Sequence, residues 1–266
     1  MDKIHPETVF TLDGTLEAFS TPDLHAHECH QLLRIRSGTT LLVTGDWQLP
    51  LFSNMTALIP AGLYHRSVVI GDPVRYKSVY LGQKDWQSGS DTIRIFDMSR
   101  LGVALFDRVC LGRENKETGR KGDREFHLQC LDLLLTLVNQ ELYRTSRITR
   151  IPVASHPDNE KLTEYIKDHF KEKLQLPDFA RVVNYSPRHV CRRFKADLGL
   201  TLFGYLRLYR MFQAAVLLSD SRLPVTQVAF SVGYDTLSSF YKDFKAVFAV
   251  TPKAFAVHRS GGKSRF

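Results

Sequence analysis

The sequence has few cysteines and no long apolar run, and these two absences exclude several classes of protein. Its 266 residues include four cysteines without a Cys-x-x-Cys pair, so neither a zinc knuckle nor a disulfide framework is expected. No stretch reaches the roughly 20 apolar residues of a transmembrane helix, and the first residues lack the charged start and apolar core of a signal peptide. We therefore expect a cytoplasmic protein outside the membrane, with reduced and mostly buried thiols at Cys29, Cys110, Cys130 and Cys191.

Composition and charge predict two folded domains with different partners. Apolar residues make up 43% of the chain and charged residues 24%, which excludes a disordered or collagen-like protein. At roughly 100–200 residues per domain, this length predicts two domains. Residues 1–155 carry 18 Lys and Arg against 18 Asp and Glu, whereas residues 156–266 carry 18 against 10, which is the whole net charge of +8. A neutral half followed by a basic half favours a regulatory domain joined to a polyanion-binding domain, although a solvated basic surface has the same charge.

The boundary between the halves is expected in the segment 145–157. This segment has two prolines, several small polar residues and no sustained apolar period. A helix over 124–143 precedes it, with apolar residues at helical spacing, and another helix follows with Asp158 as its N-cap. The sequence therefore predicts a first domain over 1–150 and a second over 156–266.

The pattern before residue 102 is that of short strands. Turn residues separate them at Ser37-Gly38, Thr44-Gly45-Asp46, Ala61-Gly62 and Gly71-Asp72-Pro73. Many short strands at this spacing predict a small β-barrel or jelly roll. Helical patterns follow at 102–110 and 124–143, and these helices either cover the barrel or form a dimer interface. The expected strands are 31–36, 39–43, 56–60, 67–70 and 76–81.

The basic half contains a helix-turn-helix pattern at about 177–198. A short helix with Pro177 in its first turn leads to Asn184, a residue that tolerates the left-handed conformation of a tight turn. A second helix follows, with Ser186 as its N-cap and Pro187 at its first position. A short turn between two helices is the arrangement that places one helix in the major groove of DNA.

The same pattern returns at about 224–248. A short helix leads to a turn at Gly233, and Asp235 or Thr236 then caps a second helix. A long helix over 203–218 joins the two units and is long enough to hold them roughly one DNA turn apart. One helical hairpin is weak evidence for DNA binding, but two in the basic half predict a protein that reaches two successive major grooves.

Three stretches of this half, 186–199, 205–218 and above all 225–255, resemble the AraC/XylS family of bacterial transcription regulators. The resemblance covers 158–259 and implies a sequence-specific regulator that binds double-stranded promoter DNA. It also implies a small-molecule or metal effector, RNA polymerase as a partner, and a homodimer. Departures from the family pattern include Ala249 in place of a common Gly.

The resemblance assigns DNA reading to the second helix of each unit. Arg188 and Arg192 suit guanine O6 and N7, whereas Cys191 either contacts a thymine methyl or packs inside the domain. The expected DNA-contacting residues are Ser186, Arg188, His189, Cys191, Arg192, Leu237, Ser238, Tyr241 and Lys242. Phosphate contacts are expected from Arg193, Lys195, Arg207, Arg210 and Lys245, although each of these is also an ordinary residue of a solvated surface.

In the neutral half, His25-Ala26-His27 followed by Gln31, and then Pro60-Ala61-Gly62-Leu63-Tyr64-His65, resemble the two motifs of the cupin superfamily. In that superfamily these positions ligate a metal inside a small β-barrel, but Gln31 stands where the family has an acid. The resemblance implies that His25, His27, Gln31 and His65 either hold a divalent metal, which imidazoles bind well, or line an effector pocket. The whole chain is then an α+β protein: a cupin-like β-barrel with flanking helices, followed by an all-α domain of two helix-turn-helix units joined by a long helix.

Two functions fit these observations. The first is a transcription regulator whose N-terminal domain senses an effector. The second is a metal-dependent cupin enzyme, of the oxygenase or isomerase type, with an accessory nucleic-acid-binding domain. Gln31 favours the regulator, because an enzyme of this fold generally needs a complete ligand set and a nearby acid or base, for which only Glu28 is a candidate. We therefore expect a regulator and no enzyme activity.

Overall fold

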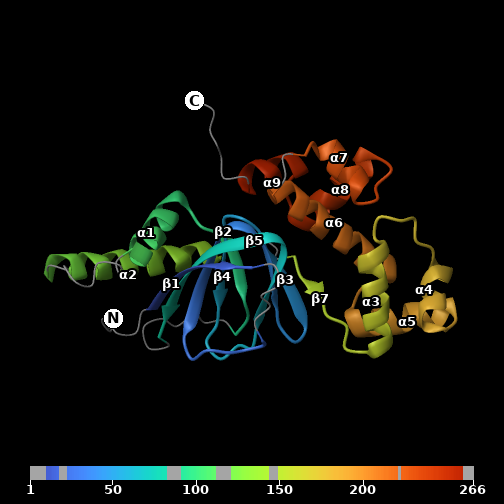
Figure 1. The fold of residues 1–266 in the computed structure, drawn as a ribbon, viewed down its shortest axis with the longest axis horizontal. Helices are drawn as coiled ribbons and strands as arrows, with labels where there is room; N and C mark the ends of the chain where they lie inside the picture. The colour runs from blue at the N-terminus through green and yellow to red at the C-terminus, as the bar shows by residue number, and fades with distance from the viewer. Residues whose placement is uncertain are drawn as a thin grey trace. The chain divides into compact units, whose positions relative to one another are not determined.

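The structure is a computed structural model that describes residues 10–17, 23–82, 91–111, 121–143, 149–220 and 223–259. Strands come first along the chain and helices follow (Figure 1). The chain divides into two compact units, one made of 1–41 and 51–148 and the other of 42–50 and 149–266. The first unit is rich in sheet and the second in helix, which confirms the predicted α+β class in two domains.

The first unit is built on antiparallel strands. Strand β1 (Phe10–Leu16) pairs with β5 (Arg66–Leu81), which lies beside β2 (His30–Val43) in the sheet. Strand β4 (Met55–Ile59) pairs with β2 on one side and with β6 (Arg94–Asp97) on the other. Side chains alternate across a strand, so Gln31 and Leu32 of β2 face opposite sides of the sheet.

Two of the expected turns are wrong, because β2 and β5 each run on where the sequence predicts a break. Gly38 lies inside β2 with φ of +88°, and Gly71 lies inside β5 with φ of +78°. Glycine adopts these angles without strain, which lets a strand bend and continue. A Cβ at Gly38 would lie 3.0 Å from the Pro73 carbonyl oxygen, so the neighbouring backbone also needs glycine there. The turn expected at 44–46 is confirmed between β2 and the next strand.

Two helices, α1 (Arg100–Leu111) and α2 (Lys121–Tyr143), pack on one face of this sheet. The leucine-rich face of α2 is therefore buried inside its own unit. This corrects the idea that the same face could bind a second copy of the chain, since a buried stripe is not available to a partner. The buried side chains of this layer are Leu32, Leu58, Val79, Leu81, Phe96, Phe106, Val109, Cys130, Leu131, Leu134, Leu135, Val138 and Leu142.

The second unit begins with a short strand pair and continues as helices. Strand β3 (Trp47–Leu51) pairs with β7 (Ile151–Pro152), which lies within the segment predicted as a linker. Of that segment, 145–148 lie outside the described residues. The first helix, α3 (Pro157–His169), starts earlier than predicted: its N-cap is His156, not Asp158, and the His156 Nδ1 accepts from the Asp158 N–H at 3.1 Å.

The remaining helices surround a core of aromatic side chains. Helix α6 (Leu202–Asp220) packs against α5 (Pro187–Leu198), α7 (Val225–Ser231), α8 (Leu237–Phe248) and α9 (Pro252–Arg259). The rings of Phe194 and Tyr205 meet edge to face, with their centroids 5.7 Å apart. Among the described residues, no helix has both the length and the apolar character needed to cross a membrane. Helix α4 (Leu176–Val183) precedes α5 in the chain. The fully buried aromatic side chains are Phe179, Phe194, Tyr205, Phe212, Phe240 and Phe244.

Candidate nucleic-acid interface and sensor site

Helices α4 and α5 form the first helix-turn-helix pair, with the ends that the sequence predicts. Helix α4 ends at Asn184, which has φ of +54° and whose N–H bonds back to the Ala180 carbonyl. Helix α5 begins after Ser186, whose hydroxyl accepts from the His189 N–H. These caps satisfy backbone groups that a helix end leaves without partners, so the turn is fixed by its own residues.

The two faces of α5 separate core from solvent. Val190, Phe194 and Leu198 recur every four residues and are buried. On the opposite face Arg188, Cys191, Arg192 and Lys195 are exposed. The exposure of Cys191 excludes the packing role. The expectation of mostly buried thiols is wrong, because only Cys130 is buried, whereas Cys29 and Cys110 are half-buried. His189 differs from the prediction, because it is half-buried and lies beside the Tyr185 ring, with centroids 4.8 Å apart.

Helices α7 and α8 repeat this arrangement. The turn residue Gly233 has φ of +85°, and a Cβ there would lie 2.7 Å from the Lys171 carbonyl oxygen, so only glycine fits. Thr236 caps α8, which decides between the two predicted caps, and its hydroxyl accepts from the Ser239 N–H at 3.3 Å. Phe240 and Phe244 are buried; Ser238, Tyr241, Lys242 and Lys245 are exposed, and Leu237 is half-buried.

The departure from the family pattern at Ala249 falls on a strained position. Helix α8 ends there with φ of +61°, just as α5 ends at Gly199 with φ of +70°. The left-handed conformation costs a residue with a side chain roughly 1–2 kcal/mol, and glycine avoids that cost. Ala249 is therefore tolerated rather than favoured at the end of α8.

Two of the predicted phosphate ligands are already engaged within the second unit. Arg210 donates from Nε to the Phe170 carbonyl and from Nη2 to the Glu172 carbonyl, both at 2.7 Å. Arg193 pairs with Asp158 at 3.4 Å and lies over the Tyr185 ring. These contacts give both arginines a structural role within the second unit, and their assignment to phosphate stays a prediction. Lys195, Lys245 and Arg207 are exposed, with Arg207 3.8 Å from an Asp243 oxygen.

The two histidine motifs of the first unit meet through their backbones. His25 and His65 exchange two hydrogen bonds, from the His25 N–H at 3.0 Å and from the His65 N–H at 2.9 Å. The Gly62 N–H donates to the His27 carbonyl at 2.8 Å. The ring of His65 consequently lies 4.7 Å from that of His25 and 5.1 Å from that of His27, measured between centroids. The structure thus brings together residues that are about forty positions apart in the sequence.

Gln31 extends this cluster into the interior of the sheet. Its amide oxygen lies 3.1 Å from the His27 Nε2, and its amide nitrogen donates to the hydroxyls of Ser78 at 2.9 Å and Tyr80 at 3.0 Å. Sequence reasoning missed Ser78 and Tyr80, because nothing in a strand's pattern says which neighbour its polar residues will face. We call His25, His27, Gln31, His65, Ser78 and Tyr80 the polar cluster of the first unit.

The polar cluster does not have the geometry of a metal centre. In the described part of the chain, no group of three or more His, Cys, Asp or Glu side chains is arranged so that it could hold a metal ion. Each histidine of the cluster uses its Nδ1 on a backbone carbonyl: His25 on Asp23, His27 on Cys29 and His65 on Leu63. These bonds fix the ring orientations, and the His27 Nε2 lies 3.1 Å from the Gln31 amide oxygen, where the cupin resemblance has an acid. The residues present therefore do not fit the metal that the cupin resemblance implies.

Burial makes His65 the most perturbed group of the cluster. His65 is 2% exposed, and its removal from water lowers the pKa of the imidazole to about 4. The neighbouring His25 and His27 lower this pKa further. The hydrogen bond to the Leu63 carbonyl works in the opposite direction but is weaker. At neutral pH His65 is therefore an uncharged polar group inside the unit.

The chain has two helix-turn-helix pairs, and the second helix of each pair exposes cations. The same chain carries a sheet unit that contains the polar cluster. These features define a DNA-binding protein with a second, separate domain. Comparison with known proteins agrees. Residues 179–257 match a family model described as a helix-turn-helix domain. The regulatory protein PocR of Salmonella typhimurium is 29% identical over 254 residues, which is 91% of this chain and 74% of PocR.

Two further relatives match about two fifths of the chain. The multiple antibiotic resistance protein MarA of Escherichia coli is 29% identical over 105 residues, which is 40% of this chain and 83% of MarA. The solved C-terminal domain of AraT, a response regulator from Geobacillus stearothermophilus, is 32% identical and covers 42% of this chain and 93% of its own, with a TM-score of 0.39. The matched helix-turn-helix domain and these relatives make the chain similar to transcription regulators of the AraC/XylS type.

Proposed function

We propose that this regulator binds a small polar effector at the polar cluster of the first unit, inside a cupin-like barrel, and that the effector changes how the second unit occupies DNA. The observation that carries the proposal is the convergence of His25, His27, His65 and Gln31, which places several hydrogen-bonding groups in a partly buried position. A few polar groups that converge in a partly buried position are the usual lining of a small-molecule site. The first unit is then a binding domain and not an enzyme.

The second unit reads DNA through the exposed faces of α5 and α8. Arginine offers two parallel donors to a guanine edge, whereas lysine suits a phosphate. The proposed partners are promoter DNA, RNA polymerase and a second copy of the chain, and the proposed place of action is the cytoplasm. The base-reading residues are Ser186, Arg188, Cys191, Arg192, Ser238, Tyr241 and Lys242, with Leu237 and His189 at the edges of these faces; Lys195, Arg207 and Lys245 bind phosphates.

Arg188→Ala or Arg192→Ala should weaken binding to a preferred duplex by roughly 1–3 kcal/mol and weaken binding to a random duplex far less. Each substitution removes the paired donors that distinguish guanine from other bases. The preferred duplex is obtained by selection from a random-sequence pool with the full-length protein, and affinities are measured by fluorescence anisotropy. Lys195→Ala is the matched control on the same face, and it should weaken both duplexes equally. Equal losses for the arginine variants would reassign them to phosphate contacts.

The effector site is tested on the full-length protein with a panel of small polar metabolites. A compound that binds there should change occupancy of the selected duplex about 5-fold to 150-fold, which is the usual range of coupling between two sites. His65→Ala and Gln31→Leu should abolish the response, and His169→Ala, a substitution at the half-exposed end of α3 in the second unit, should leave it intact. A response that survives Gln31→Leu places the effector elsewhere, and a panel without any response contradicts the sensor assignment.

A further inference from the structure

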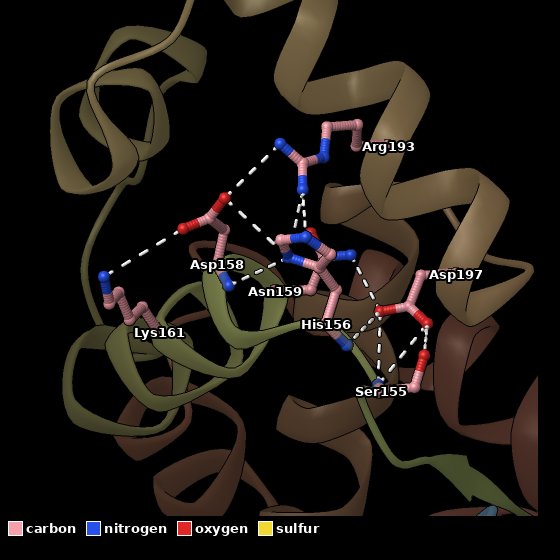
Figure 2. Close-up of polar contacts among 7 residues, drawn as sticks. All are labelled: Ser155, His156, Asp158, Asn159, Lys161, Arg193 and Asp197. Carbon is pink, nitrogen blue, oxygen red and sulfur yellow. Dashed lines mark hydrogen bonds and ion pairs between the residues drawn. The ribbon is translucent and has the colours of Figure 1, made fainter.

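The last turn of α5 is held by the chain segment that enters the second unit. The Asp197 carboxylate accepts hydrogen bonds from the Ser155 and His156 N–H groups at 3.3 Å, from the Ser155 hydroxyl, and from the Asn159 amide at 2.8 Å (Figure 2). Partial burial alone would raise the pKa of Asp197, but these hydrogen bonds outweigh it and lower the pKa. Asp197 is therefore a charged acceptor that the connecting segment surrounds with donors.

A second contact holds the same helix one turn earlier. The Arg193 guanidinium lies against the His156 ring and pairs with Asp158 at 3.4 Å. Figure 2 shows Arg193 pointing from α5 toward His156 and Asp158. His156 is also the N-cap of α3. Contacts from 155–159 thus reach two successive turns of α5 while leaving its Arg188 face free.

The same connecting segment also touches α8, at the equivalent position. Asp197 lies eleven residues after the N-cap Ser186, and Val247 lies eleven residues after the N-cap Thr236. The Thr149 hydroxyl donates to the Val247 carbonyl at 3.3 Å. One short segment, 149–159, therefore contacts the C-terminal end of both reading helices.

We propose that 149–159 is a strap that positions the two reading helices for DNA, and that Asp197 is its anchor on α5. Asp197 is a positioning residue, because its oxygens are occupied by the strap and a carboxylate would repel a phosphate. The strap favours one placement of α5, which matters because two grooves must be met at a fixed spacing. Loss of the anchor should weaken the α5 contact more than the α8 contact, since α8 has its own bond to Thr149.

The test compares the full-length protein with Asp197→Ala, Asp197→Asn and Ser155→Ala on the selected duplex. Removing an acid from a basic domain should, by charge alone, strengthen DNA binding. The strap predicts the opposite: about tenfold weaker binding for Asp197→Ala, with a smaller loss for the two conservative variants. Asp168→Ala removes the same charge from exposed α3 and serves as the control, for which unchanged or stronger binding is expected.

Footprinting shows which half of the DNA site loses its contact in Asp197→Ala. Protection should fade in the half of the site that Arg188→Ala also weakens, and persist in the half contacted by α8. Thermal unfolding is followed in parallel, and if Asp197→Ala unfolds, the comparison rests on Ser155→Ala, which removes one hydroxyl. Binding that stays equal to that of Asp168→Ala, or that falls equally in both halves and on random DNA, would overturn the proposal.

Discussion

Raising the salt concentration from about 50 to about 200 mM should weaken binding of this protein to duplex DNA by roughly 10³-fold. Each phosphate neutralised by Lys or Arg releases bound counterions, and the logarithm of affinity falls with the logarithm of salt at a slope of about −0.9 per phosphate. Six exposed cations lie on or beside the reading helices, and the slope is near −5 when each of them, including those that also contact bases, neutralises one phosphate. They are Arg188, Arg192, Lys195, Arg207, Lys242 and Lys245.

The measurement is a salt series of equilibrium affinities on random and selected duplexes. Lys195→Ala and Lys245→Ala should each reduce the slope by about 1, whereas Arg210→Gln should leave it unchanged, because Arg210 is bound to backbone carbonyls. An affinity independent of salt would contradict the proposed DNA interface. A smaller slope for Arg210→Gln would show that Arg210 also contacts a phosphate.

Lowering the pH from about 7 to about 4 should reduce the free energy of unfolding by up to about 3 kcal/mol through His65 alone. The pKa of His65 in the folded protein is about 4, against an ordinary value of 6.5. Above pH 6.5 the ring is neutral in both states and its contribution is fully present. Between 6.5 and 4 only the unfolded chain takes up the proton, so stability falls as the pH falls and the loss is complete near the folded pKa.

Urea unfolding at a series of pH values measures this effect. Carboxylates and other histidines also titrate in this range, so the diagnostic quantity is the difference between the wild type and His65→Gln. That difference should shrink steadily as the pH falls from 6.5 to 4. A constant difference would mean that His65 takes up a proton equally well in the folded and unfolded protein.

The second unit was more predictable from sequence than the first, and the reason is physical. Ser186, Pro187 and Gly233 act on their immediate neighbours, so the turn and the start of each reading helix are encoded locally. Gly38 and Gly71 carry no such local signal. Whether a glycine ends a strand or bends it depends on the partner strand, and single-sequence patterns do not specify the partner.

The candidate sites show the same limit. The cupin-like motifs identified His25, His27, Gln31 and His65, and the structure brings these residues together. The sequence pattern does not predict the hydrogen bond between Ser155 and Asp197, 42 residues away, because serine and aspartate are both common on protein surfaces. The structural contacts of Arg193 and Arg210 could not be predicted for a related reason, since the sequence shows their charge but not the groups that they contact.

The two reading helices present unlike faces, and this inequality has a consequence at the promoter. Helix α5 exposes Arg188 and Arg192, whereas α8 exposes Ser238, Tyr241 and Lys242. A single chain with two different readers prefers a site without two-fold symmetry, in contrast to a symmetric dimer that reads a palindrome. The bound protein therefore has a direction along the duplex. Inverting its site would turn its first unit toward the opposite flank, so orientation as well as distance would decide which neighbouring protein it meets.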